Sequence, residues 1–249
     1  MANSPSGESM LERIVRILEA LDGNTPSLPV AELARRTGLP SSTTYRLVDE
    51  LMASGLLDRV GREVQVGLRL WELTTRSSSA LGLREAARPH LDDLRRVLRA
   101  HALLGVLDRH DVLYVDRALA RSSAVNLATV AGRLPAHASS AGLVLMAHQP
   151  SAVQEAWLGS RFTRYTPKTP TDPTQLRRVL AAVRQQGYAE AAGLLVGPST
   201  GLAVPVEGPD GQVIAGLGIV VPVGETDATR TVPVLQAAAR GITERMRAG

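Results

Sequence analysis

Two short helical patterns separated by a tight turn are the feature that most limits how this chain can fold. In the segment PVAELARRTG, Pro29 suits the start of a helix and Gly38 ends a short apolar stripe. Only Leu39 and Pro40 separate Gly38 from a second apolar helical pattern, residues 41–54. Two short helices joined by a turn that contains glycine predict a helix-turn-helix.

The residues on either side of this motif extend the prediction. After it, LLDRVGREVQVG alternates apolar and polar residues around Gly61 and ends at Gly67, which predicts a two-stranded hairpin. Before it, we expect an amphipathic helix from Met10 to Leu21, with Ser9 as its N-cap and Gly23-Asn24 at its end. The expected apolar face of that helix consists of Leu11, Ile14, Val15, Leu18 and Leu21. Residues 1–70 therefore predict a winged helix-turn-helix.

The remaining chain predicts a linker helix and a second domain. Helical periodicity returns over residues 68–76 and 83–101, with a break at Ser77-Ser78-Ser79 and Gly82. We assign residues 71–82 to a linker helix and residues 83–249 to the second domain. In that domain we expect strands over 102–108, 111–119, 122–130, 201–208 and 212–222, and helices over 139–147, 173–186 and 232–246. A mixed or antiparallel sheet with helices on both sides predicts an α+β, sensor-like domain.

Composition excludes several kinds of chemistry. The chain has no cysteine, which excludes disulfides, thiolate catalysis and cysteine-bound zinc. Its five histidines form neither an HExxH motif nor a cluster at metal-ligand spacing, and GxSxG and phosphate-loop motifs are missing. We therefore expect no enzyme, metal or cofactor. The polar start and the lack of a run of about 20 apolar residues predict a soluble, cytoplasmic protein without membrane contacts.

Four hydroxyl residues in a row begin the second helix of the helix-turn-helix. Ser41 suits the N-cap position, and one cap uses one hydroxyl. Ser42, Thr43 and Thr44 remain, at the end of the helix that enters the major groove in such motifs. Short hydroxyls there can reach phosphates and base edges. The alternative is a solvated helix start with redundant caps.

Nearby side chains favour the DNA-binding interpretation. Arg46, one turn into the helix, can reach a guanine edge or a phosphate. We include Tyr45 among the candidate contacts, although its spacing also suits packing on the preceding helix. Arg59, Arg62 and Arg69 lie on and around the predicted wing, for which a solvated hairpin is the alternative. Residues 1–76 carry 9 Arg against 10 Asp and Glu, so DNA affinity must depend on where these arginines point.

The sequence resembles the IclR-type bacterial transcription regulators along nearly its whole length. LPSSTTYRLVDELMASGLLDR is similar to that family's recognition helix and following strand, and VGLRLWEL to the end of its wing. GRLPAHASSAGLVLMA is similar to its effector-domain motif, and QQGYA with GLAVPVEGPDGQVIAGLGIVVP to its closing strands. The resemblance implies a winged helix-turn-helix, a linker helix and a GAF-like effector-binding domain. It also implies a dimer or a dimer of dimers on palindromic operators.

The helix predicted to begin at Ser139 supplies a candidate effector site. The small residues Ser139, Ser140 and Ala141 leave its N-terminal amide groups accessible to a carboxylate, and His137 lies just before them. A capped core helix is the alternative. The resemblance implies that this helix start contacts the effector.

Further effector contacts follow from the resemblance. In family members that bind small oxo-acids, polar groups at four aligned places hold the ligand. Here those places fall on small or apolar residues, Ala191, Gly201, Gly218 and Val220, and we add Leu202 beside Gly201. Small or apolar residues in place of those polar groups remove hydrogen-bonding partners and free volume. We therefore expect a larger, partly apolar effector, such as an aromatic acid or an amide-like derivative. The alternative is a pocket filled by side chains.

Taken together, these features predict a ligand-responsive, DNA-binding transcription regulator, and we expect a repressor of neighbouring catabolic genes. Its expected partners are double-stranded DNA with a palindromic operator, a small-molecule effector and further copies of itself. The alternative is a small-molecule sensor or adaptor that does not bind DNA.

Overall fold

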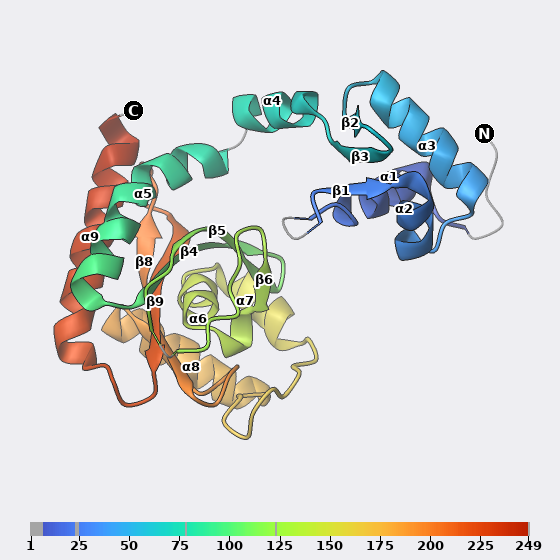
Figure 1. Ribbon diagram of the computed structural model, residues 1–249. Helices are drawn as coiled ribbons and strands as arrows, with labels where there is room; N and C mark the ends of the chain where they lie inside the picture. Colours follow the sequence, from blue (N-terminus) through green and yellow to red (C-terminus); the bar gives the residue numbers. More distant parts are fainter. Residues whose placement is uncertain (1–6, 23–24, 78, 123, 249) are drawn as a thin grey trace. The chain divides into compact units, whose positions relative to one another are not determined.

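The computed structural model describes residues 7–22, 25–77, 79–122 and 124–248 and divides the chain into two compact units (Figure 1). The first unit is Met1–Ser78 and the second is Ser79–Gly249, so the division falls within the predicted linker helix. The predicted helix end at Gly23-Asn24 and Ser78 of the predicted break lie outside the described residues. No helix in the described ranges has the length and apolar character needed to cross a membrane.

The N-terminal unit is a winged helix-turn-helix, as predicted. Gly38 ends the first helix of the motif in the left-handed conformation, with φ of 66°. The wing has the two-residue turn Gly61-Arg62, in which Gly61 has φ of 61°. The elements are α1 (Met10–Glu19), β1 (Ser27–Pro29), α2 (Val30–Thr37), α3 (Ser41–Ala53), β2 (Leu57–Val60), β3 (Glu63–Val66) and α4 (Leu68–Ser77). Strand β1 is too short to show an alternating pattern in the sequence. It is the third strand of this sheet, whose order is β1-β3-β2.

Helix α1 begins as predicted, but its apolar face is turned relative to the prediction. Ser9 accepts a hydrogen bond from the Glu12 amide and forms a capping box with it. Ile17, which was not predicted, is completely buried, whereas Leu11 is 69% exposed and Val15 is 43% exposed. The buried face is centred on Ile17 and Leu21 with Ile14 and Leu18 beside them. Leu11 lies at the N-terminal end of that face and Val15 on its flank.

The second unit is built around one antiparallel sheet. Its strand order is β6-β5-β4-β9-β8-β7, and all five neighbouring pairs are antiparallel. The strands are β4 (His101–Asp108), β5 (Asp111–Ala118), β6 (Arg133–Pro135), β7 (Ala189–Ala192), β8 (Ser199–Glu207) and β9 (Val213–Pro222). The helices are α5 (Ser79–Leu98), the short 3₁₀ helix η1 (Ala136–Ala138), α6 (Ser140–Ala147), α7 (Ser151–Leu158), α8 (Pro173–Gln186) and α9 (Ala228–Ala248).

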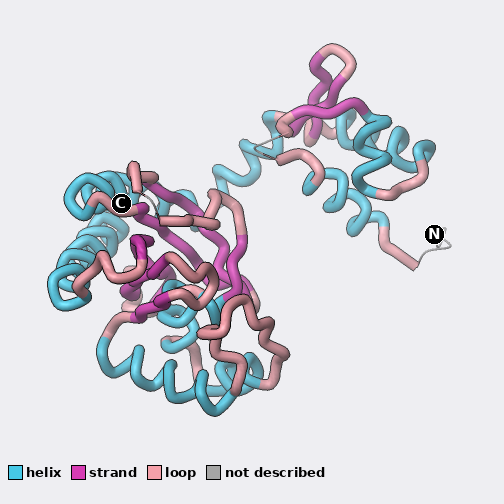
Figure 2. Tube along the Cα trace, turned by 60° about the horizontal axis from the view of Figure 1, so that its bottom comes forward, coloured by secondary structure: helices cyan, strands magenta, loops and turns pink. Residues whose placement is uncertain are grey.

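Helices cover both faces of this sheet, which confirms the predicted α+β architecture (Figures 1 and 2). Helices α5 and α9 pack together on one face, and α6 lies on the other face with α8 behind it. Because side chains alternate along a strand, β8 contributes Leu202 and Val204 to the α5–α9 core and Ala203 to the α6–α8 core.

Three predictions for this unit were wrong. Ser123 of the predicted strand 122–130 lies outside the described residues, and the described residues 122 and 124–130 form no strand. Side chains rather than a neighbouring strand bond their backbone: the Ser122 hydroxyl accepts from the Ala124 amide, and the Asn126 carboxamide oxygen accepts from the Ala128 amide. Gly82 does not break the helix, since α5 runs from Ser79 past it. The helix does not reach His101, because Arg99 adopts φ of 52° and β4 begins two residues later. Helix α7 and strand β7 were not predicted.

A β-bulge in β5 interrupts the alternation of its side chains, so that Tyr114 and Asp116, two positions apart, face opposite sides of the sheet. Leu104 of β4 pairs with Asp116 and Gly105 pairs with Tyr114, so Val115 is the extra residue. Tyr114 belongs to the α6 side. The buried carboxylate of Asp116 instead accepts a 2.9 Å hydrogen bond from Arg88 of α5. The bulge thus brings an α6-side residue and an α5-anchoring residue within two positions of each other.

Helix α6 is buried along its whole length and lies unusually close to its surroundings. A side-chain carbon added to Gly142 would stand 2.3 Å from the Cα atom of Ala136. One added to Gly216 of β9 would stand 3.0 Å from the Cβ atom of Ala141. These glycines allow the first turn of α6 to touch both η1 and the sheet.

Replacement of Gly142 by Ala tests this packing. Alanine normally stabilises a helix interior by up to about 1 kcal/mol relative to glycine. At Gly142 we expect the opposite sign, a fall of about 1–3 kcal/mol in the free energy of unfolding, because η1 must move to make room. The control is Gly82→Ala, at an exposed position of α5 where no atom stands within 4 Å of the added carbon, so stability should rise. Equal effects in chemical denaturation would contradict the close approach.

Candidate functional site

The start of α3 differs in detail from the prediction. The N-cap residue is Pro40, which offers no side-chain cap, and Ser41 is the first helical residue, so the predicted Ser41 cap is wrong. Thr44 is completely buried and its hydroxyl donates a 3.2 Å hydrogen bond to the Pro40 carbonyl. Thr44 therefore belongs to the core of the unit, and its predicted place on an outer face is also wrong.

The exposed surface of this helix start is narrower than the row of hydroxyls suggested. Ser41, Ser42 and Arg46 are exposed, and Thr43 is partly exposed. Tyr45 is 48% exposed, so its alternative interpretation as a packing residue is wrong. The core positions are Thr44, Leu47, Val48 and Leu51.

The exposed arginines of this unit have different surroundings. Arg46 forms a 2.6 Å ion pair with Glu50 one turn later on α3. Arg59 on β2 and Arg62 in the wing turn are exposed. Arg69 lies on α4, where its guanidinium donates a 2.9 Å hydrogen bond to the Ser54 carbonyl at the end of α3. Arg69 thus helps to join α4 to α3, a role that the sequence pattern did not indicate.

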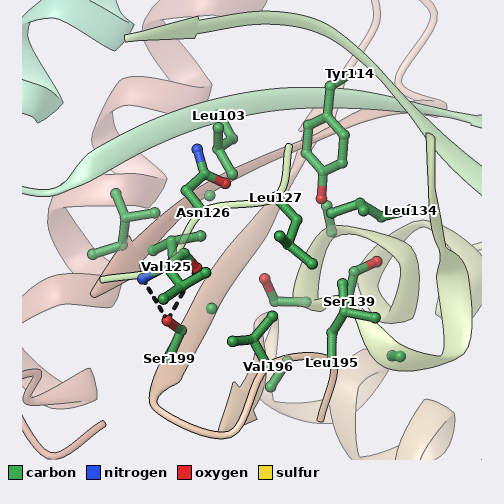
Figure 3. A pocket seen from close by; sticks show the side chains of 18 residues that line it. Leu103, Tyr114, Val125, Asn126, Leu127, Leu134, Ser139, Leu195, Val196 and Ser199 are labelled. Carbon is green, nitrogen blue, oxygen red and sulfur yellow. Dashed lines mark hydrogen bonds between the residues drawn. The ribbon is translucent and has the colours of Figure 1, made fainter. Parts of the chain in front are cut away.

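The second unit contains a pocket between the sheet and the first turn of α6 (Figure 3). The space inside it that a water-sized sphere can reach is about 60 Å³, several times what a single buried water needs. Side chains therefore leave part of this pocket unfilled. It is lined by Leu103, Tyr114, Val125, Asn126, Leu127, Leu134, Ala138, Ser139, Ser140, Ala141, Ala191, Leu195, Val196, Ser199, Gly201, Gly218, Ile219 and Val220.

The structure brings seven of the nine predicted effector residues together in this lining. These are Ser139, Ser140, Ala141, Ala191, Gly201, Gly218 and Val220. Leu202 is not among them, because it follows Gly201 on β8 and so points into the α5–α9 core on the opposite face. A side-chain carbon on Gly201 would lie 2.7 Å from the Ser140 hydroxyl oxygen, so glycine here keeps both the pocket and the helix start clear.

His137 also lies outside the lining, contrary to the prediction. Its ring is buried, contacts Phe162 and Tyr165, and its Nε2 atom makes a 2.9 Å hydrogen bond with the Thr163 carbonyl. Burial lowers the pKa of His137, against the opposing effects of Thr163 and of the Asp111 charge. This histidine therefore anchors the loop after α7 rather than facing the pocket.

The polar groups at the α6 end of the pocket are all neutral. Ser139, predicted as the first helical residue, is the N-cap of α6, and its hydroxyl accepts a 3.3 Å hydrogen bond from the Gly142 amide. The geometry of a helix start leaves the Ser140 and Ala141 amides without helical acceptors. Burial raises the pKa of Tyr114 to about 12, against the opposing effect of its hydrogen bond with Ser139. The Tyr114 phenol is therefore protonated at neutral pH.

A loop that the sequence did not identify forms much of the remaining wall. The Ser199 hydroxyl accepts from the Val125 amide at 2.9 Å and donates to the Val125 carbonyl at 3.0 Å (Figure 3). These two bonds hold Val125, Asn126 and Leu127 against the pocket. The only hint in the sequence was an apolar run between serine and asparagine, and it favoured a strand. No charged side chain lines the pocket among the described residues.

The two units define a class of protein: a DNA-binding regulator with a separate effector-binding domain. The chain belongs to the IclR family of bacterial transcription regulators. Residues 10–61 match the IclR helix-turn-helix domain, and residues 75–244 match the C-terminal domain of bacterial transcriptional regulators of the IclR type. Members of this family are transcription regulators rather than enzymes.

Individual relatives match between 72% and 97% of the chain. The Pca regulon regulatory protein of Pseudomonas putida is 28% identical over 97% of this chain and 85% of its own length. The transcriptional repressor IclR of Escherichia coli is 29% identical over 72% of this chain and 67% of its own length. A crystal structure of an IclR homologue from Microbacterium hydrocarbonoxydans, complexed with 4-hydroxybenzoate, is 42% identical with a TM-score of 0.89. It covers 97% of this chain and 100% of that one.

Replacement of Ser199 by Ala tests how the pocket wall is held. Loss of both bonds to Val125 should lower the free energy of unfolding by about 1–3 kcal/mol and speed amide hydrogen exchange in residues 124–128. Thr200→Val, at the next buried position of β8, is the control and should leave exchange in this loop unchanged. Unaltered exchange in Ser199→Ala would show that other contacts hold the loop.

Proposed function

We propose that this protein is a homo-oligomeric repressor of neighbouring catabolic genes whose DNA binding responds to a monocyclic aromatic acid or an amide-like derivative of one. One observation carries the effector class: the pocket has apolar walls, and its α6 end offers neutral hydrogen-bonding groups. The 4-hydroxybenzoate bound by the Microbacterium homologue is a ligand of this class.

The lining favours such a ligand over a small oxo-acid. An aromatic ring would be covered by the apolar side chains of Leu103, Leu134 and Val220. Its carboxylate would accept from the Ser140 and Ala141 amides, where the α6 dipole favours negative charge. Glyoxylate and pyruvate have no ring, so they would bury little apolar surface against these walls.

The DNA-binding half of the proposal places α3 in the major groove. Ser41, Ser42 and Thr43 would contact phosphates and base edges, with Arg46 behind them and the wing residues Arg59 and Arg62 on the adjacent backbone. Because the unit carries no net positive charge, these few groups would supply most of the affinity. Thr44 and Arg69 are left out, since one is buried and the other bonds to Ser54.

Two copies would present two α3 helices to the halves of a palindromic operator. Exposed apolar side chains on α1 and α4 support association, because Met10 is 52% exposed, Leu11 69% and Trp71 61%. Coupling between the pocket and DNA is reciprocal, so an effector that weakens operator binding tenfold must itself bind tenfold more weakly in the presence of operator.

Calorimetric titration tests the effector class. We expect 4-hydroxybenzoate to bind more tightly than glyoxylate or pyruvate, and Val220→Phe to abolish its binding by filling the pocket. Val223→Phe is the control, because Val223 is 43% exposed, follows β9 and does not line the pocket. Tighter binding of the oxo-acids, or equal effects of the two variants, would overturn the assignment.

Operator binding measured by gel shift tests the role of α3. Arg46→Ala should weaken binding by about 1–3 kcal/mol and relax sequence preference at one position if Arg46 contacts a base. Arg96→Ala, which removes an exposed, ion-paired arginine of the second unit, should have little effect. No salt-sensitive binding by the wild-type protein to its own upstream region would favour a sensor or adaptor without DNA binding.

A further inference from the structure

One pocket-lining residue has a buried polar atom without a hydrogen-bond partner in the described ranges. The Nδ2 atom of Asn126 is buried and makes no hydrogen bond to any of the residues that the structure describes. A buried amide donor left unpaired costs about 1–3 kcal/mol, so such atoms are rare unless something else accepts from them. Asn126 lines the pocket, and a bound ligand could provide that acceptor.

The orientation of this carboxamide is fixed. Its Oδ1 atom accepts a 3.0 Å hydrogen bond from the Ala128 amide, so the oxygen cannot exchange places with the nitrogen without losing that bond. The loop that carries Asn126 is itself held by the two bonds between Val125 and Ser199. Asn126 therefore presents a donor, not an acceptor, from a well-supported position.

The free donor is separated from the other polar groups of the pocket. Figure 3 shows Asn126 beside Leu103, and Ser139 on the opposite side, with Leu127 between them in this view. The Ser199 hydroxyl is already used twice by Val125. The polar residues of the lining thus lie in two places, at the start of α6 and around Asn126, with apolar side chains between them in this view.

We propose that Asn126 determines effector specificity by donating a hydrogen bond to an acceptor at the end of the ligand remote from its acid group. The effector is then a benzoate-type acid with an oxygen acceptor across the ring, such as a hydroxyl or ether oxygen. This inference rests on the proposed aromatic effector. It adds that an unsubstituted or alkyl-substituted ring leaves the Asn126 donor buried and unpaired.

Two probe ligands of matched size isolate this hydrogen bond. In 4-methoxybenzoate the ether oxygen can only accept, and in 4-ethylbenzoate a methylene group replaces it. Calorimetric titration of the wild-type protein should give roughly tenfold tighter binding of the methoxy compound, because the ethyl compound leaves Nδ2 without an acceptor. The pair 4-hydroxybenzoate and 4-methylbenzoate should show the same preference.

Two variants then assign the preference to Asn126. Asn126→Asp keeps the acceptor for the Ala128 amide and replaces the donor by an acceptor, so the preference for methoxy over ethyl should vanish or reverse. Asn126→Leu removes both groups and should also abolish it. Because the measured quantity is the ratio of two affinities within one protein, a general change in pocket shape or charge affects both ligands and largely cancels.

The outcomes separate the two proposals. A methoxy preference in the wild type that both variants lose supports the inference. Binding of both ligands with the same ratio in the wild type and the variants would overturn the role of Asn126 and leave the aromatic effector in place. Failure of all four benzoates to bind the wild-type protein would overturn the proposed effector class and this inference with it.

Discussion

Helix α6 lies so close to its neighbours that positions around its first turn have no room for a side-chain carbon. Gly142 faces the backbone of η1, Gly216 faces Ala141, and Gly201 faces the Ser140 hydroxyl. Because this turn is pressed onto the sheet, its free amide groups open into the space between α6 and strands β8 and β9 rather than into solvent. The pocket, its polar end and its small-residue lining all follow from that contact.

The rest of the pocket depends on how irregular segments are fixed to this framework. The backbone of residues 124–128 forms hydrogen bonds with the side chains of Ser199, Asn126 and Ser122 instead of pairing with a strand. Their apolar side chains are therefore free to form a wall of the pocket. The bulge at Val115 turns β5 so that Tyr114 faces the pocket and Asp116 binds α5. Strand β5 therefore contributes to the pocket wall and also binds helix α5.

The winged helix-turn-helix unit carries no net positive charge. Its arginines are nearly balanced by acids, and even Arg46 is paired with Glu50 in the free protein. An exposed i,i+4 pair of this kind contributes only a few tenths of a kcal/mol, so a phosphate or a guanine edge can compete for the guanidinium at small cost. Placement of a few groups, rather than a strong positive field, is the basis of the proposed recognition.

Elements with local signals could be predicted from the order of the amino acids alone. Gly38 with the two helical patterns around it predicted the helix-turn-helix, Gly61 predicted the wing, and the small residues from Ser139 onward predicted the helix at the pocket. Tertiary structure decided what depends on partners distant in sequence. Thr44 became a core residue, His137 turned to Phe162 and Tyr165, and Leu202 fell on the opposite face from Gly201. The loop around Asn126 was predicted to be a strand, but it is held by hydrogen bonds to Ser199, more than seventy residues away. A hydrogen bond between distant segments leaves no periodic pattern in either of them, so the sequence could not indicate it.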